Sequence, residues 1–190
     1  MLLLAYTTDI LPKHREAAPE DSLIVGIAEG DKEAFTSLYK LSGKSVYAYA
    51  LSILKNTTEA EDVLQDTFLK IRSSAHLYVP QGKPMAWILT ITKNVCLMRL
   101  RQKKKISFFP LESLDESLVL REISDVEDRL VLKAAFRILS DEECQIIILH
   151  SVTGWKHSET AQLLGLPVST VLSKYHRGLK KLKAELEGKL

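Results

Sequence analysis

Cysteine is nearly absent from this chain, in which Cys96 and Cys144 are the only two examples among 190 residues. Each lies alone in a segment with helical spacing, without a CxxC pattern or a histidine at ligand spacing. The sequence therefore excludes a disulfide framework and gives no support to a zinc site. We expect two buried thiols and no metal or other cofactor.

Glycine and proline are also scarce, with 8 and 6 residues, which is too few for a fold of short strands and tight turns. Apolar residues recur at helical spacing almost throughout, so we expect an all-α protein. A hydrophobic content of 46% and a charged content of 26% are typical of a globular protein. The chain length suits one larger or two small domains.

Long hydrophobic runs are missing as well. The opening MLLLAY is far shorter than the apolar part of a signal peptide and has no basic segment before it. No later stretch approaches the length needed to cross a bilayer. We therefore expect a cytoplasmic protein.

A strong net charge is absent too, because the formal charge is only +2, which by itself predicts no nucleic-acid partner. The charges are nevertheless segregated along the chain. Residues 93–105 hold six cations and no carboxylate, whereas residues 111–128 hold seven carboxylates against Arg121. Two basic modules thus flank an acidic connector.

Capping residues divide the first module into helices. Asp21 can cap a first helix and Asp31 a second, and Gly43 is expected to separate a third. The segment 58–61 has capping-box spacing and starts a fourth helix that runs to about Ser74. A loop over residues 75–83 then leads to Pro84, which suits the first turn of a long helix with Trp87 in its apolar stripe, together with Ile88, Ile91, Val95 and Met98.

These signals predict two small helical domains joined by a linker. We expect residues 1–19 to form a flexible arm, 20–105 a first domain, 106–124 an acidic linker and 125–190 a second domain. Apolar residues in the linker indicate that part of it docks on a surface: Phe108, Phe109 and Leu111. The second domain is expected to begin with a helix using Leu130, Ala134 and Ile138, followed by a capping-box start at residues 140–143.

The segment 155–183 predicts a helix-turn-helix. Small Ala161 lets two helices cross closely, Gly165 can adopt the left-handed conformation that ends the first, and Pro167 stands where the second begins. On the second helix, one stripe is apolar: Val168, Val171, Tyr175, Leu179, Leu182 and Leu186. The opposite side is polar and cationic, with Ser169, Thr170, Ser173, Lys174, Arg177, Lys180 and Lys181. DNA binding and a helical hairpin with a merely solvated basic face are both compatible with this pattern.

The helix that ends near Ser74 has an unusual outer face. Its buried stripe is expected to comprise Ala60, Leu64, Thr67 and Ile71, with Phe68 packing at the rim. The reverse face gathers an apolar side chain among acidic and polar ones: Asp62, Gln65, Asp66 and Leu69. This face is either an ordinary solvated surface or a site for a protein partner.

Three segments together resemble a bacterial RNA polymerase sigma factor of the extracytoplasmic-function class. These are AEDVLQDTFLKI (60–71), PMAWILTITKNVCLMRLRQKKK (84–105) and the helix-turn-helix. The resemblance covers about residues 20–185. It implies a non-catalytic protein with a sigma region 2-like and a region 4-like domain, which directs promoter-specific initiation of transcription and helps open the DNA.

The resemblance also implies a partner for each surface. The face of Asp62, Gln65, Asp66 and Leu69 is expected to bind the clamp helices of core RNA polymerase. The minus-ten strand of the opened promoter is expected to contact His76, Tyr78, Lys93, Asn94 and Arg101, since the loop of residues 72–83 can hold a flipped base. His76 and Tyr78 can equally be loop residues that pack against the domain.

For the minus-35 element, the resemblance implies contacts from the second helix of the helix-turn-helix: Ser169, Thr170, Ser173, Lys174, Arg177 and Lys181. Two positions depart from the family pattern. Met98 stands where the family often has Asp, and Leu172 replaces a usual Lys; we expect Leu172 to pack at the edge of the apolar stripe.

Competing functions remain open from sequence. One alternative is a helix-turn-helix regulator that does not bind core polymerase. A metal enzyme has weaker support, because His150 and His157 form the only histidine pair at useful spacing and lie on separate predicted elements. The resemblance further implies an anti-sigma factor as partner, and the acidic linker (Glu112, Asp115, Glu116) is hypothesised to cover a DNA-binding face in the free protein.

Overall fold

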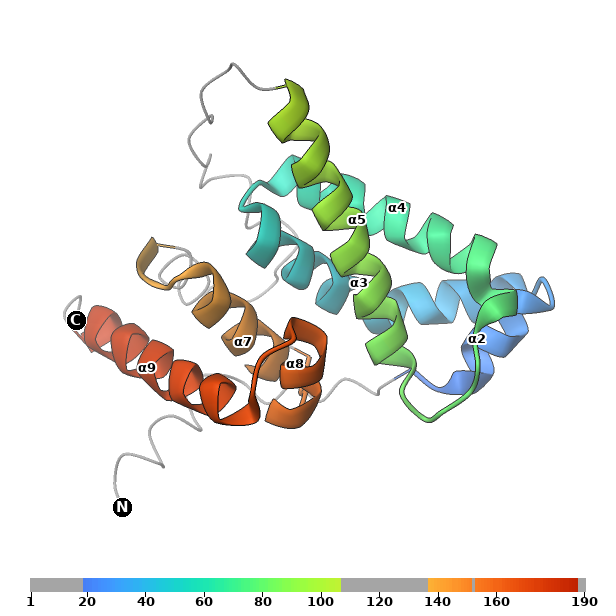
Figure 1. Ribbon diagram of the computed structural model, residues 1–190. Helices are drawn as coiled ribbons and strands as arrows, with labels where there is room; N and C mark the ends of the chain where they lie inside the picture. Colours follow the sequence, from blue (N-terminus) through green and yellow to red (C-terminus); the bar gives the residue numbers. More distant parts are fainter. Residues whose placement is uncertain (1–18, 107–136, 152, 188–190) are drawn as a thin grey trace. The chain divides into compact units, whose positions relative to one another are not determined.

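The computed structural model describes residues 19–106, 137–151 and 153–187 (Figure 1). All regular structure in these ranges is helical, which confirms the predicted fold class. The described residues belong to two compact units, with 19–106 in the first and the later ranges in the second. None of the described helices is both long and apolar enough to span a membrane.

Several expectations lie outside the described residues. They are the arm up to residue 18, the acidic linker with its aromatic residues and carboxylates, and the helix through Leu130 and Ala134. The predicted domain boundaries accordingly stay predictions.

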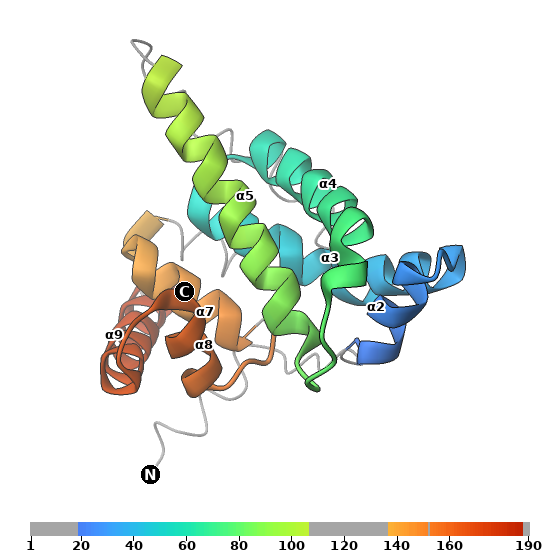
Figure 2. The same ribbon diagram turned by 45° about the vertical axis from the view of Figure 1, so that its right-hand side comes forward.

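The first unit consists of α2 (Asp21–Ala28), α3 (Lys32–Leu54), α4 (Thr57–Ser74), the 3-10 turn η1 (Ala75–Leu77) and α5 (Pro84–Ile106). Helix α3 packs against α2, α4 and α5, and α4 also packs along α5 (Figures 1 and 2). On the sides of α4 and α5 that face away from these contacts, Asp62, Leu69, Asn94 and Arg101 are exposed.

Two helix boundaries were wrongly predicted from sequence. Helix α3 continues through Gly43, because burial of its neighbours Leu38 and Val46 offsets the roughly 1 kcal/mol that glycine costs in a helix. Helix α4 is capped by Asn56, whose side-chain oxygen accepts a hydrogen bond from the Glu59 N–H, and not by the capping box at residue 58. The Asp31 cap of α3 is confirmed by bonds from the Glu33 and Ala34 N–H groups.

The core of the first unit agrees with most of the predicted stripes. Ala60, Leu64, Thr67 and Ile71 are buried on α4, and Phe68 packs edge-on against Phe35. On α5, Ile88, Val95 and Cys96 are buried, whereas Trp87 is half-buried against Tyr78. Met98 is 42% exposed and does not belong to the core stripe in which it was expected.

The second unit contains α7 (Asp141–Ser151), α8 (His157–Leu164) and α9 (Val168–Glu187). The capping box before α7 is confirmed, since Ser140 and Glu143 exchange backbone-to-side-chain hydrogen bonds. Gly165 adopts the left-handed conformation (φ 72°) that ends α8. Cys144 is a buried thiol, like Cys96.

Close helix packing in this unit depends on two small residues. Ala161 lies in the core with Ile146 and Val171, as its size indicates. Gly178, which the sequence pattern did not single out, is buried where α9 meets α7: a Cβ there would lie 2.7 Å from the Ile147 Cδ1 atom. The axes of these two helices are therefore brought together by the absence of a side chain.

Candidate functional site

The outer face of α4 is assembled as the sequence predicts. Asp62, Gln65 and Leu69 are exposed and Asp66 is half-buried, on the side of the helix opposite its buried stripe. Leu69 is 62% exposed and places a large apolar side chain among polar ones. We refer to these four residues as the α4 face.

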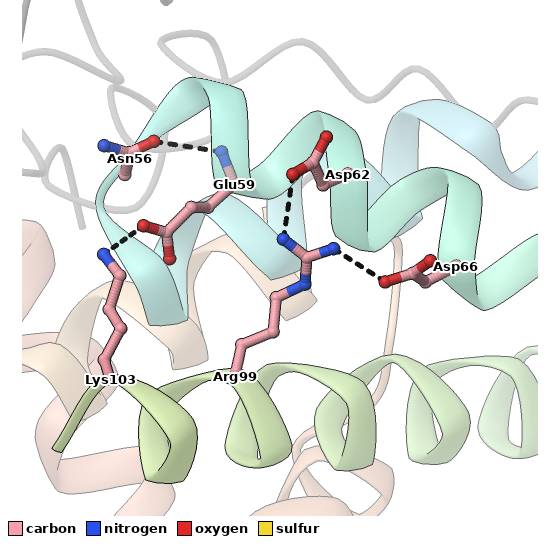
Figure 3. Close-up of polar contacts among 6 residues, drawn as sticks. All are labelled: Asn56, Glu59, Asp62, Asp66, Arg99 and Lys103. Carbon is pink, nitrogen blue, oxygen red and sulfur yellow. Dashed lines mark hydrogen bonds and ion pairs between the residues drawn. The ribbon is translucent and has the colours of Figure 1, made fainter. Parts of the chain in front are cut away.

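An arginine that the sequence pattern did not single out joins this face. The Arg99 guanidinium on α5 donates through Nη1 to Asp62 Oδ2 at 2.9 Å and through Nη2 to Asp66 Oδ2 at 2.7 Å (Figure 3). The hydrogen bond to Asp66 is the main reason that the pKa of Arg99 is raised, and the bond to Asp62 adds to it. Like charges one turn apart repel, so the bridging cation stabilises the two carboxylates side by side.

A second ion pair continues the link between the two helices. Lys103 on α5 pairs with Glu59 in the first turn of α4 (Figure 3). Two cations of the basic run at residues 93–105 are therefore already bound to α4. A count of charges along the sequence overstates how many of them are available to DNA.

The loop between α4 and α5 is fixed to the start of α2. Asp21 was expected to cap α2, but the position before the helix belongs to Glu20. The Asp21 carboxylate instead accepts a hydrogen bond from the Tyr78 hydroxyl at 2.5 Å and another from the Gly82 N–H at 2.7 Å. Burial and the bond to Asp21 raise the pKa of Tyr78 well above its ordinary value.

The rest of this loop faces outward. His76, Leu77 and Val79 are exposed, whereas the Tyr78 ring packs on Trp87 with 5.0 Å between ring centroids. Tyr78 is thus an anchor of the loop, which favours the packing alternative for this residue. His76 has the exposure that a contact with a ligand requires.

The outer side of α5 presents the remaining residues predicted for the minus-ten strand. Asn94 and Arg101 are exposed and Lys93 is half-buried. By helical spacing, Met98 lies on the same side as Asn94 and Arg101, where it adds an apolar side chain to a polar surface.

In the second unit, two of the predicted DNA contacts are engaged with α7. Lys174 Nζ lies 2.8 Å from Glu142 Oε2, and Lys181 Nζ lies 2.7 Å from Glu143 Oε2. Burial alone would raise the pKa of Glu143, but the hydrogen bond and charge of Lys181, together with the hydrogen bonds to Ser140, outweigh burial and lower the pKa. Lys181 therefore has a structural role that its place on a basic helix did not reveal.

The exposed start of α9 carries hydroxyl and apolar groups. Ser169 and Ser173 are exposed and Thr170 is half-buried, while Arg177 is exposed and lies 3.5 Å from the Ser173 hydroxyl. Leu172 is 37% exposed, so it lies at the edge of the apolar stripe with part of its side chain facing outward. Gly178 is buried on the same side of α9 as the apolar stripe, whereas Val168, which was expected in the stripe, is exposed.

A histidine pair that is separated in sequence meets in space. His150 and His157 stack at 4.4 Å between centroids, and both contact the Tyr175 ring. His150 Nδ1–H donates to the Trp155 carbonyl oxygen at 2.7 Å. Burial, with His150 and His176 nearby, lowers the pKa of His157. In the part of the chain that the structure describes, no third ligand completes a metal group, and the pair holds α7, α8 and α9 together.

Comparisons with known proteins agree on one family. The chain matches the family models "Sigma-70 region 2" over residues 38–106 and "Sigma-70, region 4" over residues 129–182. It is 27% identical over 164 residues to the RNA polymerase sigma factor CarQ of Myxococcus xanthus, covering 85% of this chain and 94% of that protein. It is 26% identical over 165 residues to the ECF RNA polymerase sigma factor SigX of Bacillus subtilis, covering 82% and 85%.

A solved structure shares the fold. CnrH, solved in complex with the cytosolic domain of CnrY, superimposes with a TM-score of 0.63 at 24% identity, covering 90% of this chain and 98% of that one.

Proposed function

Because the chain belongs to the extracytoplasmic-function class of RNA polymerase sigma factors, we propose that the α4 face is the surface by which it binds core polymerase. The protein is an alternative sigma factor that acts in initiation of transcription. This assignment replaces the alternative of a regulator that works without core polymerase.

The exposed Leu69 is the observation that carries the proposal for α4. Interface energy is concentrated in a few apolar or aromatic anchors that polar side chains surround. The α4 face has this composition, and its carboxylates suit a basic target helix. Arg99 keeps Asp62 and Asp66 in one geometry, while their half-exposed carboxylates retain an oxygen each for the partner.

The promoter contacts are proposed for two further surfaces. The loop with His76 and the outer side of α5, with Lys93, Asn94 and Arg101, bind the opened minus-ten strand. The start of α9 enters the major groove of the upstream element through Ser169, Thr170 and Ser173, with Arg177 reaching the phosphates. Tyr78, Lys174 and Lys181 are bonded within the protein, to Asp21, Glu142 and Glu143, and so stabilise the elements that carry these surfaces.

The protein acts by binding and not by bond chemistry. Holding unstacked bases in the first unit shifts the equilibrium towards open DNA, which is how a non-catalytic subunit promotes melting. We place this action in the cytoplasm with RNA polymerase. CnrH was solved with CnrY, and a chain with the same fold was solved in the complex of the sigma factor RpoE with the anti-sigma factor NepR from Bartonella quintana. We propose an anti-sigma factor as a partner of this chain too.

Binding of purified core polymerase in the absence of DNA tests the proposal. Replacing Leu69 with Ala is expected to weaken the affinity about tenfold, since truncation of an interface anchor costs on the order of 1–2 kcal/mol. Leu77→Ala is the matched control: this leucine is equally exposed but lies in the loop assigned to DNA. Fluorescence anisotropy of labelled protein gives both affinities. Equal affinities for the two variants and the wild type would contradict the role of the α4 face.

A further inference from the structure

The first two turns of α9 expose apolar side chains where a DNA-reading helix presents its base contacts. Val168 is 43% exposed and Leu172 is 37% exposed. They are four residues apart, so their side chains are neighbours along one flank of the helix. Ser169 and Ser173 lie directly beside them on the exposed side.

The first two turns of α9 present little unpaired positive charge. Lys174 is the one cationic residue between positions 168 and 175. Its ammonium group is held by Glu142 at 2.8 Å, and its side chain is largely covered. Exposed cations of α9 appear only further along, at Arg177, Lys180 and Lys181, and Lys181 is paired with Glu143.

The bases differ in what they require from such a surface. Guanine is read most often by Arg or Lys, which donate to its O6 and N7 atoms. Thymine presents a 5-methyl group in the major groove, which is recognised by apolar contact. A helix start with hydroxyl and apolar groups and an engaged lysine is suited to thymine.

We propose that Leu172, supported by Val168, is a specificity-determining residue that recognises the 5-methyl group of thymine in the upstream promoter element. This inference rests on the proposed role of α9 in reading that element. It extends that role to a residue whose position in the family pattern carries a lysine. In this arrangement the exposed Arg177 and Lys180 contact DNA phosphates, while Val168 and Leu172 contact the base edge.

Substitution of deoxyuridine for thymine isolates the methyl group, because the two bases pair alike and differ only at that carbon. The experiment uses the holoenzyme reconstituted from core polymerase and the full chain. A promoter is first selected by this holoenzyme from fragments randomised in the upstream element. Each thymine of that element is then replaced in turn, and affinity is measured by mobility shift.

The wild-type holoenzyme is expected to lose about fourfold in affinity at one or two thymines, the effect of removing one buried methyl group. With Leu172→Ala, deoxyuridine and thymine are expected to bind equally at those positions. Leu172→Met keeps an apolar side chain of similar size and should retain most of the discrimination. Because Leu172 is exposed, these substitutions leave the fold intact, which circular dichroism verifies.

Leu172→Lys provides a second measurement. The added charge should steepen the salt dependence of DNA binding by about one counterion. It should also abolish the preference for thymine over deoxyuridine.

Three results would overturn the proposal. They are selection of an element without thymine, equal affinity for deoxyuridine and thymine at every position, and a methyl effect that persists in Leu172→Ala. In all three, sequence-dependent binding of the upstream element still supports the proposed role of α9. A wild-type holoenzyme that is indifferent to the upstream sequence would instead contradict that role, and the inference with it.

Discussion

Lys181 shows how the function of a single residue depends on what lies opposite it. In sequence it is one of several cations on a basic helix, and it was expected to contact DNA. In the structure it neutralises Glu143, a carboxylate that is almost completely buried and also closes the cap of α7. Nothing in the spacing of α9 indicates this partner, because the two residues lie 38 positions apart.

Lys181→Met is expected to lower the free energy of unfolding by about 1–2 kcal/mol at neutral pH. It removes a charged hydrogen bond from a buried acid, and the partial exposure of Lys181 keeps the effect modest. The folded state holds the pKa of Glu143 below its ordinary value of 4.5. Stabilisation from this pair is therefore present above that pH and is lost as the pH falls through the lowered pKa.

Urea denaturation at several pH values measures this loss. The neighbouring Lys180→Met is the matched control, since Lys180 is exposed and makes no such bond among the contacts described above. A penalty for Lys181→Met that stays constant into the acid range would show that the pair does not act through the charge of Glu143.

At the scale of the helix, sequence predicted which side of each element is buried better than where the element ends. The buried positions of α4 were all correct, because a regular apolar stripe is a property of one helix. Gly43 was read as a break and Asp21 as a cap, since glycine and aspartate favour such roles locally. Gly43 instead lies inside α3, which is stabilised by packing against other helices, and the Asp21 side chain instead bonds to the loop between α4 and α5.

Gly178→Ala is expected to destabilise the second unit by about 1 kcal/mol. Alanine favours a helix by nearly that amount, but a Cβ at this position would lie 2.7 Å from Ile147 Cδ1, so the Ile147 side chain would have to move. Shortening the obstructing side chain should restore part of the loss. Thermal unfolding of Gly178→Ala, Ile147→Val and the double variant measures this coupling.

Additive effects of the two substitutions on the free energy of unfolding would argue against a clash between the new Cβ and the Ile147 side chain. A double variant that loses less stability than the sum of the two single losses would support this clash.

For the whole molecule, the sequence predicted an all-helical chain with two basic parts, and both units of the structure are helical. The family resemblance added the order of these units and their partners, which cannot be inferred from the spacing of apolar residues. The cross-link from Arg99 to the α4 face was missed, because two helices that are each amphipathic do not reveal which charges meet. The exposure of the α4 face was thus predicted from sequence, and the ion pairs that modify it were not.

Each unit has its own core, so residues 15–112 are expected to fold without the second unit. This fragment should bind core polymerase, compete with the full chain, and lose affinity with Leu69→Ala. Circular dichroism and competition binding measure folding and affinity. A folded fragment that does not compete would show that core binding requires the second unit as well.

The attachment of the loop to Asp21 affects the energetics of the proposed contact between this loop and the opened promoter. Tyr78 and Gly82 are both held by one carboxylate, so the exposed His76, Leu77 and Val79 stand on a loop that is already ordered. A flexible loop would lose conformational entropy each time it received a DNA strand. In the proposed contact of this loop with DNA, that entropy is already lost when the protein folds, so more of the binding energy is available to hold bases apart from their complement.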